Sequence, residues 1–157
     1  MPEIMLTRGL VAIVDEEDFA QLSKFKWYAS KDRNTFYAVR RNPKGKRPKA
    51  IRMHREILGY PPGLVDHKNR NGLDNRRENL RRCTPAQNQQ NRRKKITSKS
   101  SLKGITWHAA RKKWQAQIKV NKKNIYLGLF KTEEQAAKAY DEAATRYFGE
   151  FARGNVA

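Results

Sequence analysis

The sequence contains a single cysteine, Cys83, which excludes a disulfide within the chain. Without a Cys-x-x-Cys pair, the chain also lacks the thiolate ligands of the usual structural zinc sites. Any metal ion that the chain binds is therefore expected to be held by oxygen and nitrogen donors.

Long apolar runs are missing as well. No stretch approaches the roughly 20 apolar residues that cross a bilayer as a helix. The first residues, Met1 to Arg8, lack the charged and apolar regions of a signal peptide. We therefore expect a cytoplasmic protein without a membrane partner, acting in a nucleoid or in a phage-infected cell.

Acidic side chains are scarce relative to basic ones. Fifteen Asp and Glu stand against 35 Lys and Arg, so the net charge is +20. A field of this sign attracts polyanions. The basic residues are spread through predicted loops and strands and do not line one amphipathic helix, which disfavours an anionic membrane surface. Double-stranded DNA is the expected partner, and RNA is supported by the charge alone.

The 157 residues suffice for one ordinary domain or two small ones. A polar segment at 89–101 is almost without apolar residues and cannot bury enough surface to fold independently. We place the domain boundary at its end. The prediction is an N-terminal domain at 1–95, a basic linker at 96–101 and a C-terminal domain at 102–157.

Hydrophobic patterning predicts an α+β fold with a small antiparallel sheet in the N-terminal domain. Helices are expected at 16–22 and 54–58, and strands at 4–6, 10–14, 27–30, 36–41, 50–53 and 80–83. Asn42-Pro-Lys-Gly is assigned to a turn.

The segment after Gly59 carries the residues with catalytic chemistry. Leu64 and Val65 lead to Asp66 and His67 at the end of a strand, and a loop rich in Asn, Gly and Asp follows at 68–79. After the strand at 80–83, Thr84, Pro85 and Gln87 form the pattern of a capping box, so a helix should begin there. Asn88 then lies one turn inside this helix.

Hydrolysis of a phosphodiester needs a base, a cation and groups that hold the phosphate. His67 is the natural base because an imidazole ordinarily titrates near neutral pH. Asp66 and Asn88 offer the hard oxygen ligands that Mg²⁺ or Mn²⁺ accepts. Alone, an Asp-His pair or an Asn-rich loop is more often only a turn.

The stretch 65–91 resembles the ββα-metal core of His-Asn-His (HNH) homing endonucleases, which would occupy 64–95 here. The resemblance implies that His67 activates the attacking water and that Asp66 and Asn88 bind one divalent ion. It also implies that Asn79 pins the segment that orients the histidine.

Basic side chains around this stretch are candidates for holding the DNA backbone. They are Arg76, Arg77, Arg81, Arg82, Arg92 and Arg93. His54 and Arg55, on the predicted helix at 54–58, form a further pair that can approach the phosphate. A structural role for His54 is the alternative.

The C-terminal domain is predicted as three antiparallel strands, at 104–108, 114–120 and 125–130, packed on one helix that opens with a capping box at Thr132. The helix is expected to pack on the sheet through Ala136, Ala139, Tyr140, Ala143 and Tyr147. From Lys103 to Lys131 the chain carries eight Lys and Arg and no acid. The face of the sheet turned away from the helix should therefore be basic.

Strand alternation turns Gln115, Gln117 and Lys119 away from the helix if Ala116, Ile118 and Val120 pack on it. The segment also resembles the APETALA2-type DNA-binding domain, which implies a sheet that contacts bases in a DNA groove. The candidate base-contacting residues are Thr106, His108, Gln115, Gln117, Lys119, Asn124 and Tyr126. A solvated, charge-rich sheet is the alternative.

Together these features predict a metal-dependent, site-guided DNA endonuclease of the homing type. The alternative is a DNA-binding regulator that has kept the fold and lost catalysis. One active centre per chain is compatible with a monomer that nicks and with a homodimer that cuts both strands, and the sequence does not decide between them.

Overall fold

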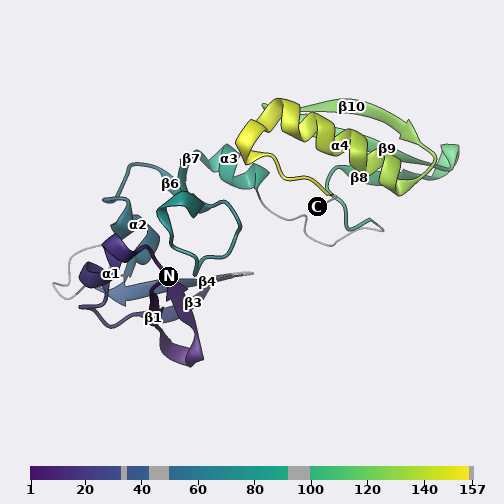
Figure 1. Cartoon of the computed structure of the whole chain (residues 1–157). Coiled ribbons are helices and arrows are strands. Elements are labelled where there is room, and N and C mark those ends of the chain that lie inside the picture. Colours follow the sequence, from purple (N-terminus) through teal and green to yellow (C-terminus); the bar gives the residue numbers. More distant parts are fainter. Residues whose placement is uncertain (33–34, 43–49, 92–99, 156–157) are drawn as a thin grey trace. The chain divides into compact units, whose positions relative to one another are not determined.

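The protein is described by a computed structural model, which forms two compact units, Met1–Pro85 and Ala86–Ala157 (Figure 1). We call them the N-terminal unit and the C-terminal unit. The structure describes residues 1–32, 35–42, 50–91 and 100–155. Most of the predicted linker at 96–101 lies outside the described residues.

The described part of the N-terminal unit contains three small antiparallel sheets. Their strands pair as follows: β1 (Glu3–Met5) with β2 (Val11–Ile13), β4 (Thr35–Arg41) with both β3 (Tyr28–Asp32) and β5 (Ala50–Arg52), and β6 (Leu64–His67) with β7 (Leu80–Cys83). The helices are α1 (Glu16–Leu22), α2 (Met53–Ile57) and the short 3-10 turns Thr7–Gly9 and Arg77–Asn79. The helix α3 (Pro85–Gln90) begins at the boundary between the units.

One apolar cluster holds the N-terminal unit together. Its fully buried members include Ala12 in β2, Val14 directly after β2, and Met53 at the start of α2. Trp27 is also buried, and its indole Nε1–H donates to the carbonyl of Leu22 at 2.8 Å, so the end of α1 is tied to the core. The α2 helix packs against β4 and β5. Its residue His54 contacts the ring of His67, the last residue of β6.

The predicted strands and helices of this unit are present, and their ends agree with the prediction to within two residues. Met53, predicted to end a strand, instead begins α2. Asp66 and His67 are the last two residues of β6, as predicted. The predicted turn Asn42-Pro-Lys-Gly45 lies mostly outside the described residues.

The C-terminal unit is a three-stranded antiparallel sheet covered on one face by a helix, as predicted. The strands are β8 (Ile105–His108), β9 (Lys113–Val120) and β10 (Lys123–Phe130) in the order β10-β9-β8, and the helix is α4 (Glu133–Phe148). Figure 1 shows α4 lying across this sheet. The Thr132 side chain accepts a hydrogen bond from the backbone N–H of Gln135, which confirms the predicted N-cap.

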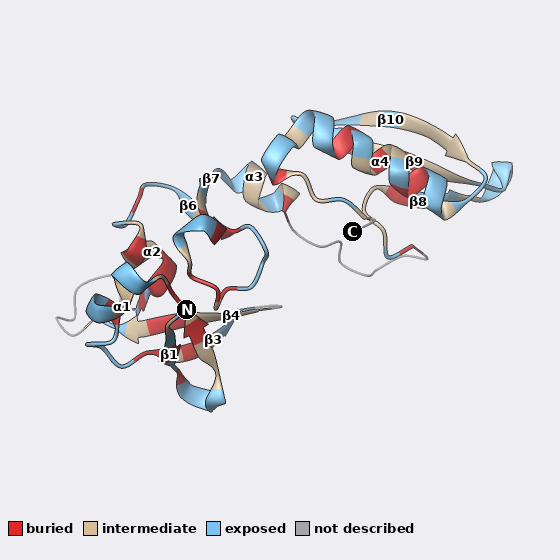
Figure 2. Ribbon diagram, in the orientation of Figure 1, coloured by how far each residue is buried: buried red, intermediate tan, exposed pale blue. Residues whose placement is uncertain are grey.

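The apolar stripe of α4 differs from the prediction at its end. Ala136, Tyr140 and Ala143 are buried as expected, but Ala137 and Ala144 join them (Figure 2). Tyr147 is 44% exposed, because Phe148 packs into the core in its place. The predicted contribution of Tyr147 to the core was therefore wrong. In the described part of the chain, no helix is long and apolar enough to cross a membrane.

Candidate active site and nucleic-acid interface

The antiparallel pairing of β6 with β7 positions the predicted catalytic pair. His67 lies opposite Leu80, and Asp66 lies opposite Arg81. Asp66 Oδ2 accepts hydrogen bonds from Arg81 Nη2 at 3.0 Å and from Nε at 3.3 Å, and both side chains are about nine-tenths buried. The negative charge of the Asp66 carboxylate is therefore already balanced by the guanidinium of Arg81 on β7.

Two aromatic rings pack against His67, which is only 3% exposed. The His54 ring lies edge-on to it with 5.0 Å between centroids, and the Tyr37 ring lies 5.7 Å away. The His54 and Tyr37 rings also touch each other, at 5.5 Å. These contacts come from α2 and β4 and hold the imidazole in place on its sides.

An amide contacts His67 from the loop between β6 and β7. The Oδ1 atom of Asn75 lies 3.3 Å from His67 Nε2, and Asn75 is fully buried. Burial lowers the pKa of His67, and the hydrogen bond to Asn75 and the charge of Asp66 oppose this effect. The imidazole of His67 is thus held in its neutral, basic form over a wider range of pH than in water.

His54 is as deeply buried as His67, with 3% of its surface exposed. Burial lowers its pKa to about 3, and the nearby His67, Arg52 and Arg55 act in the same direction. Its Nδ1 atom has no hydrogen-bond partner among the described residues. The predicted contact of His54 with phosphate stays a prediction, and what the structure shows is a buried ring packed edge-on against His67.

Asn79 joins the two ends of the loop between β6 and β7. Its Nδ2 donates to the carbonyl of Asp74 at 2.7 Å and to Asn69 Oδ1 at 3.0 Å, while its Oδ1 accepts from the N–H of Asn69 at 3.0 Å. The loop is further held by Lys68 N–H, which donates to the Asn79 carbonyl at 2.9 Å. In this structure, Asn79 shapes the loop that follows the histidine.

The loop is also fixed to the rest of the unit at its tip. A Cβ added to Gly72 would lie 2.4 Å from the carbonyl oxygen of Phe36, so only glycine allows this close approach to β4. Ile13 on β2 exchanges backbone hydrogen bonds with Leu73 and Asn75, at 2.9 and 2.8 Å. The predicted loop at 68–79 is thus docked against β2 and β4.

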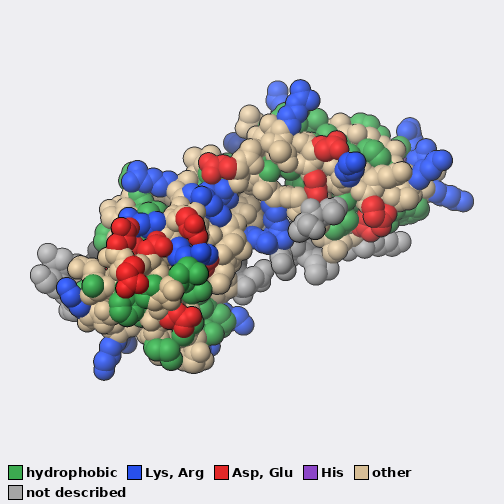
Figure 3. Space-filling model, viewed as in Figure 1, with side chains coloured by type: hydrophobic (Ala, Val, Ile, Leu, Met, Phe, Trp, Pro, Cys, Tyr) green, Lys and Arg blue, Asp and Glu red, His purple; other side chains and the backbone are tan. Residues whose placement is uncertain are grey.

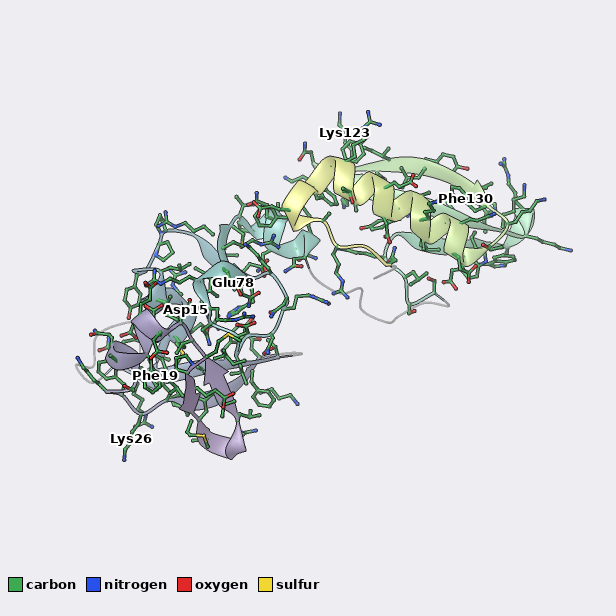
Figure 4. The ribbon with its side chains drawn as sticks, in the orientation of Figure 1. Asp15, Phe19, Lys26, Glu78, Lys123 and Phe130 are labelled. Carbon is green, nitrogen blue, oxygen red and sulfur yellow. The ribbon has the colours of Figure 1, made fainter. Side chains whose placement is uncertain are left out.

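Three of the arginines predicted to hold phosphate are engaged with carboxylates. Arg76 pairs with Asp74 at 2.8 Å and with Glu78, and Arg77 pairs with Asp18 at 2.7 Å and with Glu17. Arg81 is the partner of Asp66. Figure 4 labels Asp15 and Glu78, two acids of this network; Asp15 accepts from the Arg77 N–H at 2.7 Å.

The remaining predicted phosphate contacts differ in setting. Arg82 is exposed on β7, where alternation turns it away from Arg81. Arg55 donates to the carbonyls of Pro61 and Gly63 at 2.6 and 2.8 Å, and it thereby fixes the turn before β6. Arg92 and Arg93 lie outside the described residues.

Asn88, the predicted second metal ligand, is half-buried on α3. Most of this helix belongs to the C-terminal unit, where Lys103 Nζ donates to the carbonyl of Gln90 at its end. Burial, together with the charge of Arg153, lowers the pKa of Lys103 to about 8. The distal end of α3 is thus capped by a lysine next to β8.

The Asp66 carboxylate, next to His67 at the end of β6, is an oxygen donor of the kind that a hard cation prefers. Among the described residues, no group of three or more His, Cys, Asp or Glu side chains could hold a metal ion. Mg²⁺ needs no such cluster, because it keeps several waters and binds through one or two protein oxygens together with substrate phosphate. The carboxylate of Asp66 in the N-terminal unit and the amide oxygen of Asn88 in the C-terminal unit each have this donor chemistry, and their joint role as metal ligands stays a prediction.

Strand register places all seven predicted base-contacting residues on one face of the C-terminal sheet. Gln115 lies opposite Thr106, Gln117 opposite Tyr126, and Lys119 opposite Asn124. His108 shares the face because it is two residues from Thr106. The buried Ala116 and Ile118 point the other way, toward α4. We call these seven residues the outer face.

A glycine bulge shapes one edge of this face. The register of β10 against β9 shifts between Tyr126 and Gly128, and Gly128 has a φ of 134°, which favours glycine. Tyr126, just before the bulge, is 58% exposed. Lys123 and Phe130 mark the two ends of β10 in Figure 4.

Comparison with known proteins agrees with both halves of this description. Residues 55–90 match the family model described as HNH endonuclease, and residues 100–150 match the AP2 domain. An uncharacterized HNH endonuclease of Acanthamoeba polyphaga mimivirus is 33% identical over 155 residues, covering 94% of this chain and 76% of that protein. The chain belongs to the HNH endonuclease family.

Plant proteins match the second half. An ethylene-responsive transcription factor-like protein of Arabidopsis thaliana is 42% identical over 62 residues, which are 38% of this chain and 26% of that protein. APETALA2-like protein 2 of Oryza sativa subsp. indica is 48% identical over 52 residues, 32% of this chain and 12% of that protein. Within this HNH endonuclease, the AP2 domain therefore coincides with the sheet and helix of the C-terminal unit.

Sequence reasoning missed two residues of the histidine environment. Asn75 was one asparagine among several in a loop, and nothing in the spacing distinguishes it from Asn69 or Asn71. Tyr37 is distant in sequence and arrives through the pairing of β3 and β4. The pairing of Arg77 was missed for the same reason, since Asp18 and Arg77 are 59 residues apart.

Proposed function

We propose that this HNH endonuclease hydrolyses phosphodiester bonds of double-stranded DNA in a metal-dependent reaction and that its AP2 domain guides it to a site, as in homing endonucleases. The observation that carries the proposal is the placement of Asp66 and His67. They lie together at the end of β6, inside the segment that matches the nuclease family.

His67 acts as the general base in this proposal. Its neutral imidazole takes a proton from water, the hydroxide attacks phosphorus in line, and the bond from phosphorus to the 3′ oxygen breaks. The burial that lowers the pKa of His67 supports this role, because it keeps the ring able to accept a proton at neutral pH.

The proposed metal ligands are Asp66 and Asn88, with Mg²⁺ or Mn²⁺ as the ion. When bound, the ion supplies positive charge that stabilises the departing oxygen. Asp66 contributes a carboxylate that Arg81 holds in a fixed orientation. Asn79 keeps the loop after His67 in shape through its hydrogen bonds.

The phosphate and base contacts are proposed at two places. In the nuclease half, Arg82 is exposed and is proposed to contact the DNA backbone. Arg76, Arg77, Arg81 and Arg55 are proposed to do so by exchanging their present partners for phosphate, and His54 would first have to become accessible. In the AP2 domain, the outer face carries amides that can pair with adenine and a lysine that can reach guanine or phosphate.

A plasmid-nicking assay tests the catalytic part. The full chain is incubated with supercoiled DNA and Mg²⁺, with and without chelator, beside the variants His67→Ala and Asn71→Ala. Asn71 lies in the same loop and its side chain bonds only locally to Leu73 among the contacts described, so it is the matched control. Chelator-sensitive nicking that His67→Ala abolishes and Asn71→Ala retains is expected. Cleavage that survives His67→Ala would overturn the proposed base.

A cleavage map tests the guidance. If the AP2 domain selects the site, the intact chain cuts a long natural DNA at one or a few positions, and Gln117→Ala spreads the cuts over many positions. If the unmodified protein cuts without sequence preference, the protein is a non-specific nuclease and the proposed guidance by the AP2 domain is wrong. Binding without any cleavage would instead favour a DNA-binding regulator.

A further inference from the structure

The contact between Asn75 and His67 determines which nitrogen of the imidazole carries the proton. The 3.3 Å contact joins Asn75 Oδ1 to His67 Nε2. An amide oxygen only accepts hydrogen bonds, so the imidazole nitrogen facing it must carry the proton. In a neutral imidazole the other nitrogen, Nδ1, then holds the lone pair and is the basic atom.

The orientation of the Asn75 amide is itself determined by its other contact. Its Nδ2 lies 3.2 Å from the carbonyl oxygen of Leu73. A carbonyl oxygen can accept only from the amide nitrogen, so Nδ2 must face Leu73 and Oδ1 must face the histidine. A flipped amide would set two acceptors against each other at Leu73.

The backbone around Asn75 makes this arrangement rigid. The Asn75 N–H donates to the carbonyl of Ile13 at 2.8 Å, and Ile13 N–H donates to Leu73 at 2.9 Å. The carbonyl of the preceding residue, Asp74, accepts from Asn79 at 2.7 Å. Asn75 is fully buried, so water does not compete for the amide.

The rings around His67 complete the constraint. Because His54 and Tyr37 pack at centroid distances of 5.0 and 5.7 Å, a rotation of the imidazole by half a turn has to occur inside a packed site. Asn75 opposes such a rotation, since the rotated ring would place the Cε1–H group opposite the amide oxygen and lose the hydrogen bond from Nε2–H.

We propose that Asn75 is a positioning residue that selects the Nε2–H tautomer of His67 and thereby presents Nδ1 as the atom that accepts the proton from water. This inference rests on the proposed role of His67 as general base. The loop amide acts through the histidine and touches neither the metal ion nor the DNA in this proposal.

The experiment combines NMR of the imidazole nitrogens with nicking kinetics on the full chain. Spectra of ¹⁵N-histidine protein are recorded at pH 8, where a neutral imidazole is expected for His67, and the His67 signals are assigned with His54→Gln and His108→Gln. The variants are Asn75→Leu, which removes the acceptor; Asn75→Asp, which keeps an acceptor and removes the donor to Leu73; and Asn71→Ala as the loop control.

The unmodified protein should show an Nε2 proton on His67 that exchanges slowly with water. In Asn75→Leu, this protection is lost, both nitrogens carry the proton part of the time, and the nicking rate falls on the order of 100-fold. Asn75→Asp keeps the Nε2 proton and most of the rate, and Asn71→Ala changes neither. Binding of Mn²⁺, followed by its paramagnetic resonance, should be unchanged in Asn75→Leu.

Retention of a protected Nε2 proton in Asn75→Leu would overturn the proposal, as would a rate no lower than that of Asn71→Ala. If Asn75→Leu fails to fold, Asn75→Asp decides: an Nδ1 proton in this variant contradicts the assignment. The NMR result stands without catalysis, so an unmodified protein that shows the tautomer and does not nick DNA would refute the proposed function and leave the tautomer intact.

Discussion

The two units use their charges differently. In the N-terminal unit, arginines near the active centre are paired with acids, and on the face shown in Figure 3 acidic and basic side chains lie beside one another. In the C-terminal unit, no acid occurs between Lys103 and Lys131, and all the acids lie in α4 or after it. The outer face is therefore left without acids to neutralise its lysine.

This difference shows that a high count of basic residues does not by itself locate a DNA-binding surface. A paired and buried arginine contributes to folding, while an unneutralised lysine contributes to the attraction of phosphate. We therefore expect charge-removing substitutions to affect mainly stability in the N-terminal unit and mainly DNA affinity in the C-terminal unit. The following predictions would break or sharpen this contrast.

The largest effect is expected at the buried ion pair of the nuclease half. Arg81→Met leaves Asp66 buried without its cation, which should lower the free energy of unfolding by about 3–5 kcal/mol. The double variant Asp66→Asn/Arg81→Met should recover much of the loss because no buried charge remains. Urea unfolding of both variants measures this. A single variant as stable as the unmodified protein would contradict the structural role of the pair.

Acid should unfold the N-terminal unit first, because both buried histidines, His54 and His67, lie there. The pKa of His54 is about 3 in the folded protein and near 6.5 when unfolded, so the unfolded chain binds more protons between these values. Its contribution to stability is complete above pH 6.5 and declines as the pH falls toward 3. The lowered pKa of His67 acts in the same direction.

The expected loss from His54 is on the order of 3 kcal/mol between pH 6.5 and 4. Urea unfolding at a series of pH values should therefore show a steep slope that becomes shallower in His54→Gln. Backbone amide NMR signals should show residues of the N-terminal unit lost before those of the C-terminal unit. An unchanged slope in His54→Gln would show that the ring is not held neutral.

Substitutions on the outer face should leave stability within about 0.5 kcal/mol and weaken DNA binding. Gln117→Ala should cost roughly 1–3 kcal/mol for the preferred sequence if the amide pairs with a base. The Gln117→Ala substitution should change the affinity for DNA of random sequence only slightly. Fluorescence anisotropy with selected and scrambled duplexes separates these outcomes, and an equal loss on both duplexes would argue against base contact.

The smallest effects concern the arginines of the nuclease half. Arg82→Gln should lower the slope of log affinity against log salt by about 0.9, the value for one phosphate contact. Arg76→Gln should leave this slope unchanged, because Arg76 is already paired with Asp74 and Glu78. A salt slope that falls in Arg76→Gln would show that DNA displaces the carboxylates.

Local patterns in the sequence predicted much of the fold. The alternation in 114–120 and the capping pattern at Thr132 each depend on neighbouring residues, and both are confirmed. The placement of Asp66 and His67 at the end of a strand was predictable for the same reason. The seven residues of the outer face share a face because side chains alternate along each strand and the register shift of β10 comes only after Tyr126.

Contacts between distant residues could not be predicted in this way. The Asn75 amide faces His67 only because β2 receives the loop through Ile13, and no local pattern encodes that contact. Tyr147 was misplaced because the helical period allowed it in the buried stripe, whereas Phe148 is the residue that packs on the core and Tyr147 is 44% exposed. The pairing of Arg77 with Asp18 depends on the tertiary fold as well.

The central claim is that Asp66 and His67 form a metal-dependent catalytic centre for DNA cleavage. The most direct measurement is nicking of supercoiled plasmid by the full chain in Mg²⁺, compared with chelator and with His67→Ala at equal DNA binding. The account predicts nicked circles with the unmodified protein alone. Nicking that persists in chelator or in His67→Ala, or an unmodified protein that binds the plasmid and leaves it intact, would contradict it.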